Sequence, residues 1–226
     1  MANKLQAMIA AGAALVSLAG SVVGAHALTA APADAAGCAD VLVLAARGTN
    51  EALGWWWTPG LGSVVGNPVY NAIDNAFAQT TNGYKVEYPA GTNQPASVQQ
   101  GNRDVVAHLT ERAAACPDQK YVLVGYSQGA NVMDNAMGIS SEGAKVGGPI
   151  VATIPAHVEP RIKAVLLFGN PIRGIGKSVT GPYATRTYDV CNTNDPVCDP
   201  NGSDWNVHLQ YKKYADEAAA FVKARL

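Results

Sequence analysis

The stretch Lys120-Tyr-Val-Leu-Val-Gly-Tyr-Ser127-Gln-Gly-Ala-Asn131 contains the strongest structural signal in the chain. The apolar residues 121–124 predict a buried strand, and residues 130–137 predict a helix. Glycines stand two residues before and two residues after Ser127. A strained strand-to-helix turn needs glycines there, because a Cβ at either position would collide with the neighbouring chain. An ordinary Gly-Ser turn is the alternative, but the flanking strand and helix favour a serine nucleophile at the end of a sheet.

A serine hydroxyl becomes a useful nucleophile when a histidine takes its proton and a carboxylate orients that histidine. When the serine lies on such a turn, the acid and then the histidine follow it along the chain. Of the four histidines, His26 lies in an apolar N-terminal segment, and His108 precedes the serine on a predicted helix. His157 comes before a predicted strand, which places it at the opposite end of the sheet. We therefore predict that His208 is the base.

The acid is expected in the polar segment that precedes this histidine. Asp195 lies between Cys191 and Cys198, and a disulfide between these cysteines would hold its carboxylate in place. Asp199 and Asp204 are the alternatives, with solvated turns as their ordinary role. We predict that Asp195 orients the base.

Two hydrogen-bond donors must face the oxyanion that forms when a nucleophile attacks a carbonyl carbon. The backbone N–H of Gln128, directly after the serine, is the first predicted donor. The second is expected in a turn after an earlier strand, and Arg47-Gly-Thr49 is such a turn. Thr49 offers both an N–H and a hydroxyl there. Ordinary loop chemistry is the alternative for this turn.

Short apolar runs alternate with amphipathic segments through the rest of the chain. This alternation predicts a parallel sheet between two helical layers, and 226 residues without repeats or linkers fit one such domain. The strands are expected at 40–46, 84–88, 121–124, 162–168 and 185–190, and the helices at 69–77, 97–115, 130–137 and 209–226.

The N-terminal segment has the pattern of an export signal. Lys4 precedes a run of small apolar residues from 7 to 24, and small-residue cleavage sites follow it. A membrane anchor is disfavoured because the run lacks a basic stop-transfer flank, and a lipoprotein because Cys38 lies far downstream. We predict a signal peptide over 1–35 and a mature domain over 36–226.

The four cysteines all belong to this predicted mature domain, and an even number in an exported chain indicates disulfides. Three pairings are open, and joining Cys191 to Cys198 leaves Cys38 with Cys116. A zinc site would need a second close pair. The formal charge of −1 gives no sign of a nucleic-acid partner or an anionic membrane surface.

The motifs collected above resemble those of the cutinase family of small serine esterases, over nearly the whole mature chain. The spacing of Cys191, Asp195, Cys198 and His208 is the most specific part of the resemblance. Three further segments share it, namely Ala46-Arg-Gly-Thr-x-Glu51, Val86-Glu-Tyr-Pro-Ala90 and Gly125-Tyr-Ser-Gln-Gly129.

The resemblance implies an α/β-hydrolase fold, a three-layer sandwich with a five-stranded parallel sheet, and a solvent-accessible serine without a large lid. It also implies the catalytic triad Ser127, Asp195 and His208, the oxyanion donors Thr49 and Gln128, and the disulfides Cys38–Cys116 and Cys191–Cys198.

Four tryptophans depart from the usual family pattern. Trp55, Trp56 and Trp57 follow the oxyanion turn, and Trp205 lies three residues before the predicted base. At least one of the first three is expected to form an apolar lip for an acyl chain or lipid surface, since indole rings suit such an interface. Packing of one or two of the rings under their loop is the alternative. Trp205 is expected to narrow the cleft beside His208.

Together these features predict a secreted, monomeric esterase, acting outside the cell or at its wall, that uses an acyl-enzyme and no metal or cofactor. The expected partners are short- to medium-chain acyl esters, with a cutin-like polyester or a lipid as the natural substrate, and transient contact with a lipid or polymer surface. The alternatives are an acetylxylan esterase and a catalytically silent cell-surface binding protein on the same scaffold.

Overall fold

The computed structural model describes residues 37–226, so the predicted signal peptide lies outside the described residues. Five parallel strands form one sheet in the order β2-β1-β3-β4-β5. Their bounds are β1 Val41–Ala46, β2 Thr81–Lys85, β3 Lys120–Tyr126, β4 Ile162–Phe168 and β5 Thr187–Val190. The predicted five-stranded parallel sheet is confirmed. Among the described residues, no helix is both long and apolar enough to cross a membrane.

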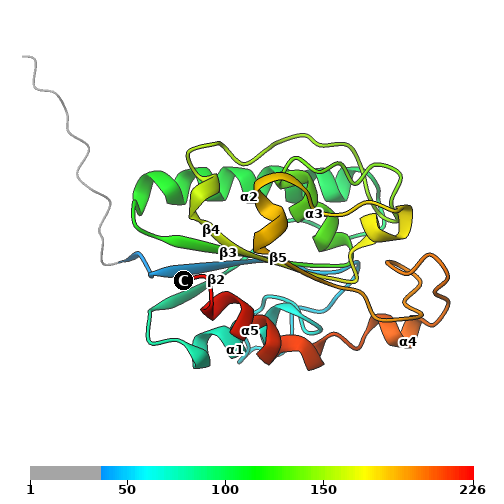
Figure 1. Ribbon diagram of the computed structural model, residues 1–226, viewed down its shortest axis with the longest axis horizontal. Helices are drawn as coiled ribbons and strands as arrows, with labels where there is room; N and C mark the ends of the chain where they lie inside the picture. The colour runs from blue at the N-terminus through cyan, green and yellow to red at the C-terminus, as the bar shows by residue number, and fades with distance from the viewer. Residues whose placement is uncertain (1–36) are drawn as a thin grey trace, which may run out of the picture. The chain divides into compact units, whose positions relative to one another are not determined.

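Helices cover both faces of this sheet (Figure 1). One face carries α2 (Ala96–Ala115) and α3 (Gln128–Ala136), and the other carries α1 (Gly66–Ala76) and α5 (Ala215–Lys223). The three layers are those of the predicted sandwich. The short helices are η2 (Glu159–Arg161), η3 (Pro171–Ile175), η4 (Gly181–Arg186), α4 (Trp205–His208) and η5 (Lys212–Tyr214).

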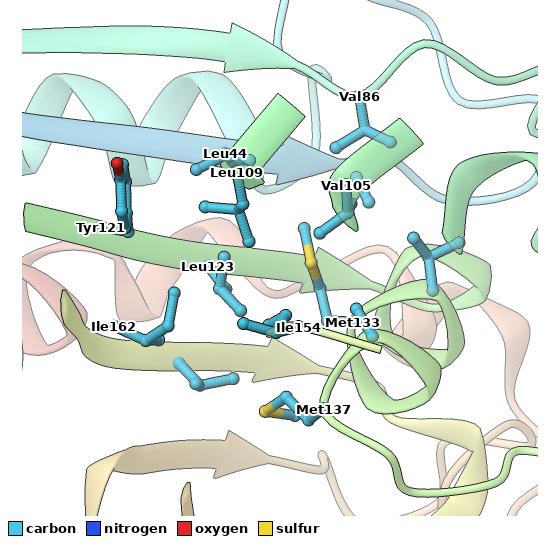
Figure 2. Close-up of a cluster of buried hydrophobic side chains, with 14 of the residues drawn as sticks. Leu44, Val86, Val105, Leu109, Tyr121, Leu123, Met133, Met137, Ile154 and Ile162 are labelled. Carbon is cyan, nitrogen blue, oxygen red and sulfur yellow. The ribbon is translucent and has the colours of Figure 1, made fainter. Parts of the chain in front are cut away.

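The three central strands are buried on both faces, which explains why their sequences are continuous apolar runs. On one face Leu44 and Leu123 pack with Val105 and Leu109 of α2 and with Met133 of α3 (Figure 2). The other face has its own cluster, which includes Val43, Val122, Phe168, Tyr211 and Val222.

Two predicted elements were wrong in their bounds. The strand expected at 84–88 is β2, which begins at Thr81 and ends at Lys85, because this edge strand is formed largely by exposed or half-buried residues. The helix expected at 209–226 is interrupted, and only its last part is α5. At the start of this segment Tyr211 is fully buried and its hydroxyl accepts from Asn192 N in the loop after β5, while Leu209 is 60% exposed.

Two disulfides confirm the predicted pairing of the cysteines. Cys38 is joined to Cys116, which ties the start of β1 to the end of α2. Cys191 is joined to Cys198, seven residues further along, and closes the loop that follows β5.

Parallel strands place all their carboxyl ends at one edge of the sheet, where ligands of such folds bind. β1 runs into the turn at residues 47–51, β3 runs into Ser127, and β5 runs into the loop closed by the second disulfide. The topology therefore brings together every segment that the sequence selected for chemistry.

Candidate active site

Ser127 occupies a strained turn between β3 and α3. Its φ is +53° and its ψ is −118°, a conformation that residues with a side chain rarely adopt. A Cβ at Gly129 would lie 1.9 Å from the carbonyl oxygen of Ala46, and one at Gly125 would lie 2.7 Å from Ala130 Cα. The turn is held at its centre because Ser127 N donates to the Phe168 carbonyl, at 2.9 Å. The glycines are thus required by close packing, as the sequence indicated.

His208 ends α4 and is buried beside the serine turn. Its Nδ1 lies 2.7 Å from Asp195 Oδ2 and 2.9 Å from Oδ1. Gly169 makes room for the ring, since a Cβ there would lie 2.9 Å from His208 Cε1. Tyr126, the last residue of β3, donates its hydroxyl to the His208 carbonyl at 2.8 Å. The carboxylate engages Nδ1, so Nε2 is the ring nitrogen that remains free to take up a proton.

The alternative acids and histidines lie elsewhere. Asp199 accepts from two backbone N–H groups of its own loop, and Asp204 caps α4 by accepting from Asn206 N at 2.9 Å. His108 stacks on Tyr84, with ring centroids 3.4 Å apart, far along α2. His157 is exposed just before η2 and β4, at the amino edge of the sheet.

Asp195 is a fully buried carboxylate whose oxygens are all engaged. Besides His208, it accepts from Val197 N at 2.8 Å and from the Tyr211 hydroxyl at 2.5 Å. Burial on its own would raise the pKa of Asp195, but the hydrogen bonds from His208, Tyr211 and Val197 outweigh burial and lower it. The carboxylate is therefore kept ionised. The contact with Tyr211 was not predicted from the sequence.

Thr49 and Gln128 lie beside the serine and are linked to each other. Gln128 Nε2 donates to Thr49 Oγ1 and to the Gly91 carbonyl, both at 2.9 Å, while Oε1 accepts from Ser97 Oγ at 2.7 Å. Because a carbonyl only accepts, the amide nitrogen must face Gly91 and Thr49. The Thr49 hydroxyl thus accepts from Gln128 and keeps its own hydrogen for another acceptor. The N–H of Gln128, in the first turn of α3, has no acceptor within the helix.

Glu51 holds the turn at residues 48–51 in shape. Its carboxylate accepts from Gly48 N at 2.7 Å and from Val64 N at 2.6 Å. Burial raises the pKa of Glu51, although these backbone hydrogen bonds oppose the rise. The loop from 52 to 62 leaves and returns at this carboxylate, and the Ser63 N to Ala52 carbonyl bond, at 2.9 Å, closes its base.

A cavity of about 610 Å³ opens over the serine and the histidine. Its walls include Val64, Val197 and Trp205, so they are largely apolar. Within residues 37–226 no hydrogen bond joins Ser127 Oγ to His208, although both line the cavity, a looseness that is common before a substrate binds. No cluster of three or more potential metal ligands occurs in the described part of the chain.

Trp205 lines this cavity, whereas the other three tryptophans lie on the loop between two of its lining residues, Ala52 and Ser63. Trp205 is 61% exposed and lines the wall, with its ring edge-on to His208 at a centroid distance of 5.8 Å. Trp55, Trp56 and Trp57 are 70%, 90% and 63% exposed on the loop held by Glu51. Trp55 and Trp57 stack on each other, with centroids 5.3 Å apart. None of these three rings is packed under its loop, which contradicts the alternative considered from the sequence.

Comparison with known proteins gives a consistent picture. The cutinase family model matches residues 37–226. The chain is 41% identical to a cutinase of Kineococcus radiotolerans over 168 residues, which cover 73% of this chain and 53% of that protein, so the match spans about half of the relative. It is 34% identical to phospholipase Culp4 of Mycobacterium tuberculosis over 200 residues, which cover 87% of this chain and 83% of the relative. The catalytic core of acetylxylan esterase from Trichoderma reesei superimposes with a TM-score of 0.68 at 27% identity, covering 84% of this chain and all of that one (100%).

Proposed function

The chain belongs to the cutinase family and is a serine ester hydrolase, and from this premise we propose that it cleaves carboxylic esters through an acyl-enzyme on Ser127. The observation that carries the proposal is the buried pair His208–Asp195, which opens onto the same cavity as the strained serine. A histidine held at Nδ1 by an ionised carboxylate presents Nε2 as a base.

The chemistry follows from these groups. As Ser127 Oγ bonds to the carbonyl carbon, its proton passes to His208 Nε2, and Asp195 stabilises the imidazolium. The carbonyl oxygen becomes an anion in front of Thr49 and the Gln128 N–H. The tetrahedral intermediate expels the alcohol, which takes the proton from His208. Water then gives a proton to His208 and attacks the acyl carbon, and the acid leaves as Ser127 regains its proton.

A fluorophosphonate probe tests this assignment, because it labels only an activated serine. Wild type should be labelled and should hydrolyse p-nitrophenyl butyrate, and Ser127→Ala should do neither. Ser203→Ala is the control, since its hydroxyl lies in an exposed part of the disulfide loop region. Absence of labelling in the folded wild type would favour the catalytically silent binding protein.

Short- to medium-chain acyl esters, presented by a lipid or polyester surface, are the proposed substrates. The apolar cavity of about 610 Å³ is large enough for such an acyl chain. The exposed indoles of Trp55, Trp56 and Trp57 support contact with an apolar surface. Replacing all three with Ser should lower the rate on emulsified or polymeric ester more than on soluble p-nitrophenyl acetate, and an equal loss on both would contradict this role.

Acetylxylan esterase activity is the second candidate, because a solved enzyme of that kind shares the fold and exposed indoles also stack on sugars. Rates on p-nitrophenyl esters of increasing chain length, measured beside acetylated xylan, separate the two. A preference for acetylated xylan over butyrate would select the second candidate.

We also propose that the protein is exported and acts as a monomer. Two disulfides suit an oxidising compartment outside the cytoplasm, and the predicted signal peptide supports the same location. Recovery of the mature chain from the culture medium or the cell-wall fraction, at the size of one copy in gel filtration, is the expected result.

A further inference from the structure

Tyr211 is a buried side chain outside the predicted triad that touches its acid. Its hydroxyl lies 2.5 Å from Asp195 Oδ2 and 3.1 Å from Asn192 N. A backbone N–H can only donate, so the hydroxyl must accept from Asn192. Its own hydrogen then has two acceptors within reach, and the Asp195 carboxylate at 2.5 Å is nearer and stronger than the disulfide sulfur of Cys198 at 3.5 Å. The direction of the hydrogen bond to Asp195 is therefore fixed by the neighbours of Tyr211.

The hydroxyl of Tyr211 contacts the loop that carries Asp195, while its ring packs against aromatic side chains of the sheet. The ring centroid lies 5.9 Å from that of Tyr126 on β3 and 6.0 Å from that of Phe168 on β4. The side chain is fully inaccessible to solvent, so it has little freedom to move. These strands also end at the serine turn. Tyr211 consequently gives the carboxylate a fixed point on the same rigid element that positions Ser127.

The hydroxyl also completes the surroundings of the carboxylate. Oδ1 accepts from Val197 N, and Oδ2 accepts from Tyr211, while His208 Nδ1 is within reach of both oxygens. With one donor on each oxygen besides the histidine, the carboxylate is prevented from rotating away from the ring. We propose that Tyr211 is a positioning residue that fixes the orientation of Asp195 and limits its affinity for the proton shared with His208. This inference rests on the proposed ester hydrolysis.

The electrostatics agree with this role. Burial, and next the hydrogen bond to Asp195, raise the pKa of Tyr211 well above its ordinary value, so the residue stays a neutral donor. The same hydrogen bond is one of those that lower the pKa of Asp195. Removal of the donor should leave a more basic carboxylate, which holds the proton of the His208–Asp195 pair more tightly.

Tyr214 provides a matched control one helical turn away. Its hydroxyl donates to Asn192 Oδ1 at 2.8 Å, so both tyrosines are bonded to the same asparagine, but only Tyr211 reaches Asp195. Removal of either hydroxyl breaks one hydrogen bond to Asn192. A difference between Tyr211→Phe and Tyr214→Phe therefore reports on the carboxylate.

The experiment measures kcat and KM of wild type and both variants on p-nitrophenyl butyrate from about pH 5 to 9. Tyr211→Phe should lower kcat about 10- to 100-fold with little change in KM, as expected for loss of a hydrogen bond to a charged group. The acidic limb of its kcat/KM profile should move to higher pH, because the pair stays protonated longer. Tyr214→Phe should keep the wild-type profile. Equal effects of the two variants, or a lower kcat with an unmoved acidic limb, would overturn the proposal.

A fluorinated tyrosine at position 211 keeps the inference testable if Tyr211→Phe does not fold. It retains the hydroxyl and makes it a stronger donor, so the acidic limb should move to lower pH. An unmoved limb would count against the role of Tyr211. Fluorophosphonate labelling of wild type is run in parallel, because an unlabelled wild type removes the proposed function itself, whereas a labelled one with no shift removes only this inference.

Discussion

Two aspartates with fully buried side chains, Asp195 and Asp134, have pKa values shifted in opposite directions by their surroundings. Asp195 accepts hydrogen bonds from His208, Tyr211 and Val197, which together lower its pKa despite burial. Asp134, on the helix that Ser127 begins, has no hydrogen-bond partner for either oxygen among the described residues. Burial raises the pKa of Asp134 well above its ordinary value. Between these two carboxyls, the hydrogen-bond donors decide whether the pKa is lowered or raised.

Asn170, a polar neighbour of Asp134, donates its amide hydrogen to a different carboxylate, that of Asp189. Asp189 of β5 accepts from Asn170 Nδ2 at 3.1 Å and forms an ion pair with Arg173 Nη1 at 3.4 Å. After burial itself, the charge of Asp189 is the next cause of the raised pKa of Asp134. The surroundings thus stabilise the charged form of Asp195 and destabilise the charged form of Asp134.

Replacement of Asp195 by Asn should have the largest effect of the changes that test this comparison. The histidine would lose the anion that fixes its tautomer and stabilises its protonated form, so kcat should fall about 10⁴-fold. Steady-state rates on p-nitrophenyl butyrate measure the loss. Asp199→Asn, in the same loop but accepting only from backbone N–H groups, should change kcat little. A similar loss in both variants would mean that the loop and not the carboxylate is responsible.

Opening of the Cys191–Cys198 disulfide should have a smaller effect. Loss of this disulfide, which joins residues seven positions apart, removes about 2 kcal/mol from the free energy of unfolding in the chain-entropy model. Because this loop carries Asp195, kcat at saturating substrate should also fall when both cysteines become Ser. Removal of Cys38–Cys116 should lower stability in urea without lowering kcat of the folded protein. An unchanged kcat in both double variants would show that the loop is held without its disulfide.

Asp134→Asn should have the smallest effect, and it should raise the free energy of unfolding where the disulfide variants lower it. A carboxyl whose pKa is raised in the folded state weakens the fold as the pH rises above its unfolded pKa, about 4. The neutral amide avoids that loss, so the variant should gain about 1 kcal/mol over wild type at pH 8 and little at pH 4. Urea unfolding at both pH values measures the gain. Asp195→Asn should instead lose stability relative to wild type as the pH rises, because its carboxylate is the stabilised form. A stability gain for Asp134→Asn at pH 4 that equals the gain at pH 8 would contradict the neutral-carboxyl interpretation.

The sequence was informative where local geometry determines structure. The glycines around Ser127 and the spacing of Asp195 between two cysteines both express short-range constraints, so the turn and the loop could be predicted. Assembly of Thr49, Gln128 and the histidine at one edge followed from the parallel topology, and their catalytic roles stay predictions. Tyr211 was missed because its importance arises from packing across β3 and β4. In the sequence, Tyr211 lies in a segment whose apolar residues repeat with a helical period. The same pattern led us to place the start of the last helix too early.

The loop from 52 to 62, which carries Trp55, Trp56 and Trp57, is closed at its base by Glu51 and can be treated as a separate unit of the chain. Both of its ends are fixed by one carboxylate and by the Ser63–Ala52 hydrogen bond, and no side chain within 53–57 lines the cavity. Between its ends the segment from 53 to 60 is bonded by Asn67, which donates to the Leu53 carbonyl and to Thr58 Oγ1. An exchanged segment that keeps these two acceptors should leave the turn at residues 48–51 in its shape. The proposed surface contact and the proposed catalytic residues therefore lie in separate stretches of chain, so one can be redesigned without rebuilding the other.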